Sequence, residues 1–255
     1  PSGAVAMEVT FLGTGTAIPS ATRAPTSLLV RAAGEPLLFD TGPGILRQLV
    51  ATGLYINDVE YVFYTHIHPD HVADLVPLIF ASKNPELVRT RPLRLYGGPG
   101  FAAFVRGLQD AYHPWAEPTV FEIEVVEIGS SPLEGEGWTI TTAPVLHHAS
   151  SLAYRIEADG VVVTYSGDTD TCKAIVELAR ASDLLILECA HPDDQKVEGH
   201  LSPTACGRIA AEAEAKALAL VHFYPACEGA DLIGPCRKEY GGPVTIAEDL
   251  MTITV

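Results

Sequence analysis

The strongest chemical signal in this chain is a cluster of four metal-capable side chains within residues 66–71. His66 and His68 are two residues apart, so they can point the same way from an extended segment. Asp70 and His71 follow a proline and can turn toward a second ion. Such a cluster can hold two transition-metal ions side by side, and paired metals are typical of enzymes that hydrolyse ester or amide bonds. Imidazole and carboxylate ligands favour two Zn²⁺ ions, with Fe or Mn as the alternatives.

The cluster follows an apolar run, residues 61–64, that is typical of a buried strand. Active sites of layered α/β folds gather where such strands end. A solvated polar turn is the alternative interpretation of residues 65–71. The density of ligand side chains favours a metal site over that alternative.

A dinuclear site needs about four to six protein ligands and an open position for water. Further ligands must therefore come from other strand ends. Three places qualify, each after a predicted strand: His147 or its neighbour His148, Asp168, and His222. A single histidine or aspartate at a strand end is a weak signal alone, but the order of these residues along the chain strengthens it.

Strand-like and helix-like segments alternate along the chain, with no low-complexity linker. The sequence predicts strands at residues 8–12, 27–31, 37–40, 61–64, 93–96, 120–128, 138–142, 152–157, 161–165, 184–187 and 217–221, with residues 246–255 supplying the end. It predicts helices at residues 45–52, 74–81, 101–110, 171–180 and 203–215. Two βα halves that face each other fit this layout. The metals would then lie along the seam, reached by loops from both halves.

The bulk properties are those of a folded globular protein. With 255 residues, of which 47% are hydrophobic, the chain can form a single domain over residues 1–255. Its net charge is −16, and so acidic a surface repels polyanions. We therefore expect a small-molecule substrate rather than a long nucleic acid. Bound metals would reverse the local field and admit a small anionic substrate.

The five cysteines are scattered without a CxxC pair, and their odd number argues against a disulfide scaffold. No apolar run in the sequence approaches the roughly 18 residues of a membrane span. Residues 1–6 lack the charged and apolar regions of a signal peptide. The expected location is therefore the cytoplasm, without membrane association.

The ligand candidates, taken in order, resemble the pattern of the metallo-β-lactamase fold superfamily over nearly the whole chain. The resemblance implies an α/β fold, a four-layer αββα sandwich. It also implies two ligand sets: His66, His68 and His147 for the first metal, and Asp70, His71 and His222 for the second. Asp168 would bridge both ions beside a bridging hydroxide, and Asp40 would orient the cluster.

His147 and His148 compete for one ligand position. In similar members of the superfamily, the ligand lies seven residues before a tyrosine in a tyrosine-arginine pair. Tyr154 and Arg155 form such a pair, and His147 stands at that spacing. The resemblance therefore favours His147 and leaves His148 as a neighbour in the pocket or on the surface.

Further segments resemble the ribonuclease Z branch of the superfamily. They are Leu12-Gly13-Thr14-Gly15 with Pro19 and Arg23, Leu38-Phe39-Asp40, Arg91-Pro92-Leu93 before Tyr96-Gly97, and Gly199-His200-Leu201-Ser202. In that branch an acid and a histidine form a proton relay. The resemblance implies that Glu188 orients His200 and that His200 acts as general acid. A capping or surface histidine is the alternative for His200.

Two features depart from that branch or stand apart in this chain. The RNA-processing enzymes carry a long arm that grips transfer RNA between the third histidine motif and the bridging aspartate. Here twenty residues separate His147 from Asp168, filled by two predicted strands and a turn.

In the insertion at residues 106–118, Tyr112 and Trp115 either cap the pocket as a lid or bury in a subunit contact. The resemblance implies a homodimer.

The leading hypothesis is therefore a dinuclear metal-dependent hydrolase of small phosphodiesters. It would use the bridging hydroxide, with Asp70 as proton acceptor and His200 as proton donor. The second hypothesis keeps the site and changes the bond to a lactone, a β-lactam, an aryl sulfate or a phosphotriester. Few basic residues lie near the motifs to grip a phosphate, with Arg23 and Arg155 as candidates. A transfer RNA 3′-processing endonuclease and a non-hydrolytic metal-binding protein are less favoured.

Overall fold

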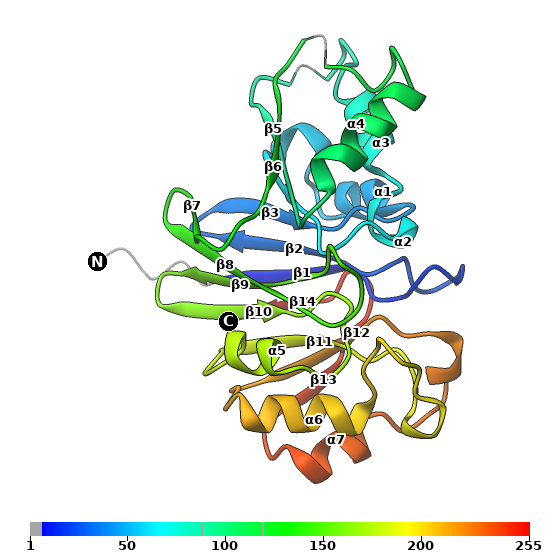
Figure 1. Ribbon diagram of the computed structural model, residues 1–255, viewed down its shortest axis with the longest axis vertical. Coiled ribbons are helices and arrows are strands. Elements are labelled where there is room, and N and C mark those ends of the chain that lie inside the picture. Colours follow the sequence, from blue (N-terminus) through cyan, green and yellow to red (C-terminus); the bar gives the residue numbers. More distant parts are fainter. Residues whose placement is uncertain (1–6, 88, 119) are drawn as a thin grey trace.

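Two β-sheets pack face to face between outer layers of helices in the computed structural model of this protein (Figure 1). The structure describes residues 7–87, 89–118 and 120–255. Residues 1–6, where no signal peptide is expected, lie outside this described part of the chain. The layer order of helix, sheet, sheet and helix confirms the expected αββα sandwich.

The described residues form two sheets of seven strands each. The first has the order β14 (Thr252–Thr254), β1 (Glu8–Gly13), β2 (Ser27–Ala32), β3 (Glu35–Phe39), β4 (Tyr61–Phe63), β5 (Leu93–Gly97) and β6 (Ile123–Glu127). The second has the order β13 (Val244–Ile246), β12 (Leu218–Val221), β11 (Leu184–Glu188), β10 (Val161–Tyr165), β9 (Leu152–Ala158), β8 (Trp138–Pro144) and β7 (Leu133–Glu134). Pairing is parallel from β3 to β6 and from β10 to β13. Parallel strands end at one edge of their sheet, so the loops that follow them lie near one another.

Side-chain alternation along the strands explains the layers. On β2, Val30 packs into the core between the sheets, while Leu29 packs with the helices outside. On β11, Ile186 faces the core between the sheets and Leu185 faces the other helix layer. Successive side chains of a strand point to opposite faces, so a strand covered on both sides is apolar throughout.

Short helices cover the outer face of each sheet. The first sheet is covered by α1 (Ile45–Ala51), α3 (Leu75–Ala81) and α4 (Phe101–Ala111), with the single turn α2 (Pro69–Val72) beside them. The second is covered by α5 (Lys173–Leu178), α6 (Pro203–Glu212) and α7 (Ile233–Glu239). Within the described ranges, no helix has the length and apolar character needed to cross a membrane.

Most predicted elements are present, including the β9–β10 hairpin, whose turn residues Asp159 and Gly160 both have positive φ. Several predicted boundaries were wrong. Residues 120–122 do not join β6, and the helices predicted at 171–180 and 203–215 end at Leu178 and Glu212. Left-handed residues, Ala181 and Glu214, follow these two helices, because the chain must turn back into a parallel strand. The terminal segment 246–255 contributes to both sheets, and β7 and α7 were not predicted.

Aromatic side chains lock the two sheets together beside the end of β4. Phe63 stacks between Phe39 and Tyr96, with ring centroids 5.0 and 4.9 Å away. From the opposite sheet, Trp138 and Tyr154 approach its ring edge-on at 6.1 and 5.9 Å. Phe63 is fully buried. This packing holds β4, and the residues that follow it, against the second sheet.

The substitution Phe63→Ala should lower the free energy of unfolding by about 3–5 kcal/mol, because it removes a buried ring and leaves a cavity. Phe80→Ala is the control, since that ring is 52% exposed; it should change the free energy by no more than about 0.5 kcal/mol. Urea unfolding followed by circular dichroism measures both. Equal losses at the two positions would contradict a central packing role for Phe63.

Candidate metal centre

Backbone contacts shape the segment that follows β4. His68 is extended, with φ −65° and ψ 148°, and a proline then opens α2, where its missing N–H is not needed. Gly42 lies so close to this turn that a Cβ there would be 1.9 Å from the carbonyl oxygen of Asp70. The N–H of Thr41 donates to the carbonyl of His71 at 2.7 Å. The loop after β3 therefore supports the α2 turn through direct backbone contact.

The side chains of the first predicted triad converge, with His66 buried and His68 and His147 half-buried. Nε2 of His66 lies 3.0 Å from Nδ1 of His68, and Nε2 of His147 lies 3.1 Å from the same atom. One ligand atom from each of the three residues falls within 4.8 Å of the others. His148 is turned aside, with Nδ1 hydrogen-bonded to the hydroxyl of Ser150 at 2.8 Å. The structure thus brings His147, rather than His148, into this triad.

The second predicted triad lies beside the first, with Asp168 between them. Oδ2 of Asp70 is 3.7 Å from Nε2 of both His71 and His222. Oδ2 of Asp168 is 3.4 Å from Nε2 of His71 and 3.2 Å from Nε2 of His222. The same oxygen is 3.7 Å from Nε2 of His66 in the first triad. Asp168 therefore occupies the position expected of a bridging ligand.

Several buried polar atoms at this centre have no hydrogen-bond partner within the described residues. They are Nε2 of His71, Oδ1 of Asp168, and both ring nitrogens of His222. Buried polar atoms without partners are costly, so native proteins rarely leave several together. All belong to residue types that bind Zn²⁺, Fe or Mn. The donor set fits divalent cations at both triads.

Asp40 supports the second triad from behind. Its Oδ2 accepts hydrogen bonds from Nδ1 of His71 at 2.9 Å and from the hydroxyl of Thr65, while its Oδ1 accepts from the N–H of Thr65. Because Nδ1 of His71 donates to Asp40, its Nε2 faces the centre. Burial disfavours charge on His71, but Asp168 and Asp40 outweigh it and hold its pKa well above the usual value in the metal-free protein.

His66 has the opposite electrostatic balance. Burial, together with the neighbouring His71, holds the pKa of His66 below its usual value. The imidazole of His66 is therefore neutral in the metal-free protein. A neutral imidazole has a lone pair available for a metal ion.

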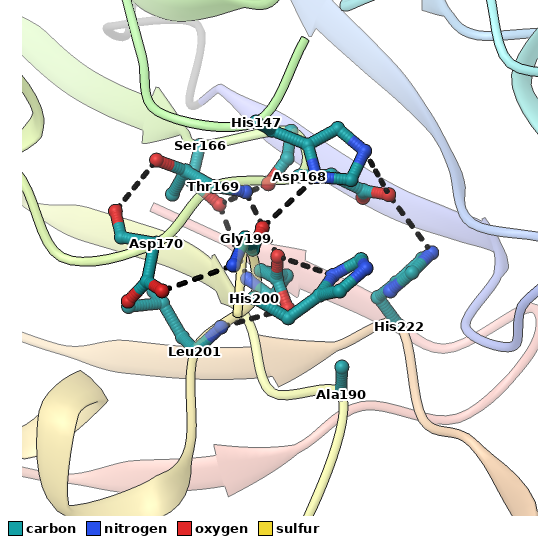
Figure 2. Close-up of polar contacts among 12 residues, drawn as sticks. His147, Ser166, Asp168, Thr169, Asp170, Ala190, Gly199, His200, Leu201 and His222 are labelled. Atoms are coloured by element: carbon teal, nitrogen blue, oxygen red, sulfur yellow. Dashed lines mark hydrogen bonds and ion pairs between the residues drawn. The ribbon is translucent and has the colours of Figure 1, made fainter. Parts of the chain in front are cut away.

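Glu188 and His200 form a pair next to both triads, and their surroundings are shown in Figure 2. Oε1 of Glu188 accepts from Nδ1 of His200 at 2.9 Å and from the N–H of Thr169 at 2.8 Å. Its Oε2 accepts from the N–H of Leu201 at 3.2 Å. Burial opposes charge on His200, but the Glu188 carboxylate raises the pKa of that imidazole above its usual value. His200 is therefore a half-buried histidine hydrogen-bonded to Glu188 rather than a free surface histidine.

Two residues beside the centre were not predicted. Tyr224 follows His222 by two positions, and the two ring centroids are 5.7 Å apart. His191 stacks on Tyr224, with centroids 4.7 Å apart. The sequence marks these two residues only by position: Tyr224 comes just after His222, and His191 comes a few residues after Glu188.

The loop after α4 contributes to an apolar groove beside the segment that carries the first ligand candidates. The groove has a volume of about 910 Å³ and is lined by Ile67, Phe80, Tyr112 and Trp115, among others. Tyr112 and Trp115 are 51% and 60% exposed. The homodimer and the lid both stay predictions.

Comparison with known proteins identifies the family of this chain. Residues 36–223 match the family model described as the beta-lactamase superfamily domain. Ribonuclease Z of Mycobacterium bovis (strain BCG / Pasteur 1173P2) is 30% identical over 281 aligned residues, which cover 98% of each chain. Among solved structures, the metallo-beta-lactamase fold protein YhfI from Bacillus subtilis superimposes with a TM-score of 0.85 at 26% identity, over 98% of this chain and 99% of that one. The short form of human tRNase Z superimposes with a TM-score of 0.78 at 26% identity, over 96% and 98%.

Three observations support one assignment: the layered fold, the convergence of the two triads, and these similarities to known proteins. The chain belongs to the metallo-β-lactamase superfamily, where it resembles ribonuclease Z, and it is a metal-dependent hydrolase.

Proposed function

We propose that this hydrolase cleaves small phosphodiesters with two zinc ions. The observation that carries the proposal is the meeting of two ligand triads at one carboxylate, Asp168, with the Glu188–His200 pair beside them. Two adjacent cations suit the transfer of a phosphoryl group, whose entering and leaving oxygens both carry charge. The chain is similar to ribonuclease Z, whose name describes an enzyme that cleaves RNA. This similarity supports a phosphodiester as the bond that is hydrolysed.

Seven residues would hold the two ions. His66, His68 and His147 would bind the first, Asp70, His71 and His222 the second, and Asp168 both. When bound, such ions make water a better nucleophile and neutralise charge on the phosphoryl group. Asp40 orients this set through its hydrogen bond to His71.

The proton transfers are assigned to three residues of the chain. Asp70 accepts a proton from the attacking water. His200 donates a proton to the leaving oxygen, and Glu188 both orients it and favours its protonated form. General acid catalysis of this kind contributes about 10²–10⁴-fold to the rate.

The surface and the loops support a small substrate. The net charge of −16 opposes the close approach of a long polyanion. Between His147 and Asp168, the chain forms β9 and β10 with a turn at Asp159 and Gly160, and no arm extends from these described residues. A small phosphodiester needs neither a positive surface nor such an arm.

Lactones, β-lactams, aryl sulfates and phosphotriesters are the second group of candidate substrates, and the two arginines favour the uncharged ones among them. Arg155 donates to the carbonyls of Leu178 and Arg180. Arg23 donates to the hydroxyl of Thr14 and to a backbone carbonyl. Both guanidinium groups therefore have structural partners. Lactones, β-lactams and phosphotriesters carry no charge at the bond that is cleaved, so they depend less on a free arginine. An aryl sulfate carries the same single charge as a phosphodiester.

The substitution Asp40→Asn should weaken metal retention about 10–100-fold, because an amide supports the His71 ligand less well than a carboxylate. Chelator titration followed by elemental analysis measures this, and the wild type should hold about two ions per chain. Asp249→Asn is the matched control: Asp249 accepts bonds from Thr14, Ala24 and Gln48 but belongs to neither triad. Wild-type content below about one ion per chain after metal-replete purification would rule out the dinuclear site.

A substrate panel separates the two candidate functions. We expect the zinc-loaded enzyme to turn over bis(p-nitrophenyl) phosphate and to leave lactones, β-lactams and aryl sulfates unchanged, because paired cations can stabilise both the entering and the leaving oxygen of a phosphoryl transfer. Chelation should abolish the activity, and added zinc should restore it. Turnover of lactones without turnover of the phosphodiester would support the second candidate instead.

His200→Ala should slow phosphodiesters with poor leaving groups more than those with good ones. A poor leaving group depends on protonation, while a good one departs without it, so the excess loss for alkyl over p-nitrophenyl groups should reach about 10-fold or more. Steady-state rates on matched aryl and alkyl phosphodiesters measure the difference. Equal losses on all substrates would remove the general-acid role.

A further inference from the structure

Residues 196–201 form a strap that contacts both His147 and the proton relay. Nδ1 of His147 donates to the carbonyl of Gly199 at 2.9 Å, and the next residue along the strap is His200. The φ of Gly199 is +86°, a conformation that favours glycine, and a Cβ there would lie 3.4 Å from Nδ1 of His147. The orientation of one peptide group is therefore linked to both histidines.

Asp170 anchors this strap through hydrogen bonds to Lys196 and Gly199. Its Oδ2 accepts from the N–H of Gly199 at 3.0 Å and from Nζ of Lys196 at 2.8 Å, and its Oδ1 accepts from the N–H of Thr171 at 2.7 Å. Figure 2 shows Asp170, Gly199 and His147 in this chain of contacts. A backbone bridge between Leu146 and Asp170 places the carboxylate next to the loop that carries His147.

We propose that Asp170, braced by Lys196, is a positioning residue for both His147 and His200. The inference rests on the proposed roles of His147 as ligand and His200 as proton donor. By fixing the Gly199 peptide, Asp170 keeps its carbonyl aimed at Nδ1 of His147. That bond keeps the proton on Nδ1 and leaves Nε2 unprotonated for a metal ion. The same anchor fixes the start of the segment from which His200 reaches Glu188.

The test compares Asp170→Ala and Lys196→Met with Asp183→Asn. Asp183 is a matched control, because it also pairs with a lysine, Lys216, and accepts from a backbone N–H, that of Val162 at 2.8 Å. Asp183 precedes β11, whereas Glu188 is the last residue of that strand. Asp183 therefore lies at the other end of the strand from the relay. Its side chain is 19% exposed, against 15% for Asp170.

Two readouts are measured on each variant: Co²⁺ binding by electronic absorption, and the leaving-group dependence of phosphodiester hydrolysis. Asp170→Ala should weaken Co²⁺ binding about 10–100-fold, alter its spectrum and slow poor leaving groups more than good ones. Lys196→Met should change both readouts in the same direction by a smaller factor. This variant is the one to measure if Asp170→Ala does not fold. Asp183→Asn should match the wild type.

Wild-type Co²⁺ affinity and spectrum in Asp170→Ala, with equal rate losses on all substrates, would overturn the inference. The same readouts unchanged in Lys196→Met would also overturn the bracing role of the lysine. A wild-type enzyme that cleaves no phosphodiester would instead contradict the proposed function. In that case the Co²⁺ spectra still decide whether Asp170 positions His147.

Discussion

The centre of this molecule depends on the surroundings of a single carboxylate oxygen. Oδ2 of Asp168 lies 3.2–3.8 Å from imidazole nitrogens of four histidines: His66, His71, His147 and His222. Such a buried carboxylate is unfavourable unless positive charge or hydrogen-bond donors surround it. Its neighbours come from loops of both sheets, so the oxygen keeps them only while the two sheets remain packed. The aromatic contacts of Phe63 and the αββα layers maintain that arrangement.

Much of the fold was predictable because local signals and tertiary structure agree. Apolar runs predict strands at residues 161–165 and 184–187, and the structure has strands at Val161–Tyr165 and Leu184–Glu188. Predictions failed where long-range packing decides. Helices α5 and α6 end before their predicted boundaries, and the left-handed residues Ala181 and Glu214 then turn the chain back toward the sheet. The apolar pattern of these helices contains no signal for that early end. Helix α7 was missed because it is short and its polar residues obscure its periodicity.

The candidate site also has parts that the sequence predicts and parts that it does not. Histidines and aspartates at strand ends are visible in a sequence because their side chains are rare and chemically specific. The choice between His147 and His148 required the family pattern, and the bond from His148 to Ser150 agrees with that choice. The role of Asp170 was not predictable, because its contact joins residues 29 positions apart through a backbone N–H. Every residue except proline has that group, so the sequence does not mark the contact.

The distribution of the ligand candidates has a consequence for the synthesis of the chain. The loops of the first sheet supply His66, His68, Asp70 and His71, while those of the second supply His147, Asp168 and His222. Neither half contains a complete triad, so a growing chain on the ribosome cannot close the centre before His222 has emerged. Capture of the second ion, as proposed, would then be a late event that couples the docking of the halves to metal supply. In a cell short of zinc, the two halves would be held together less tightly.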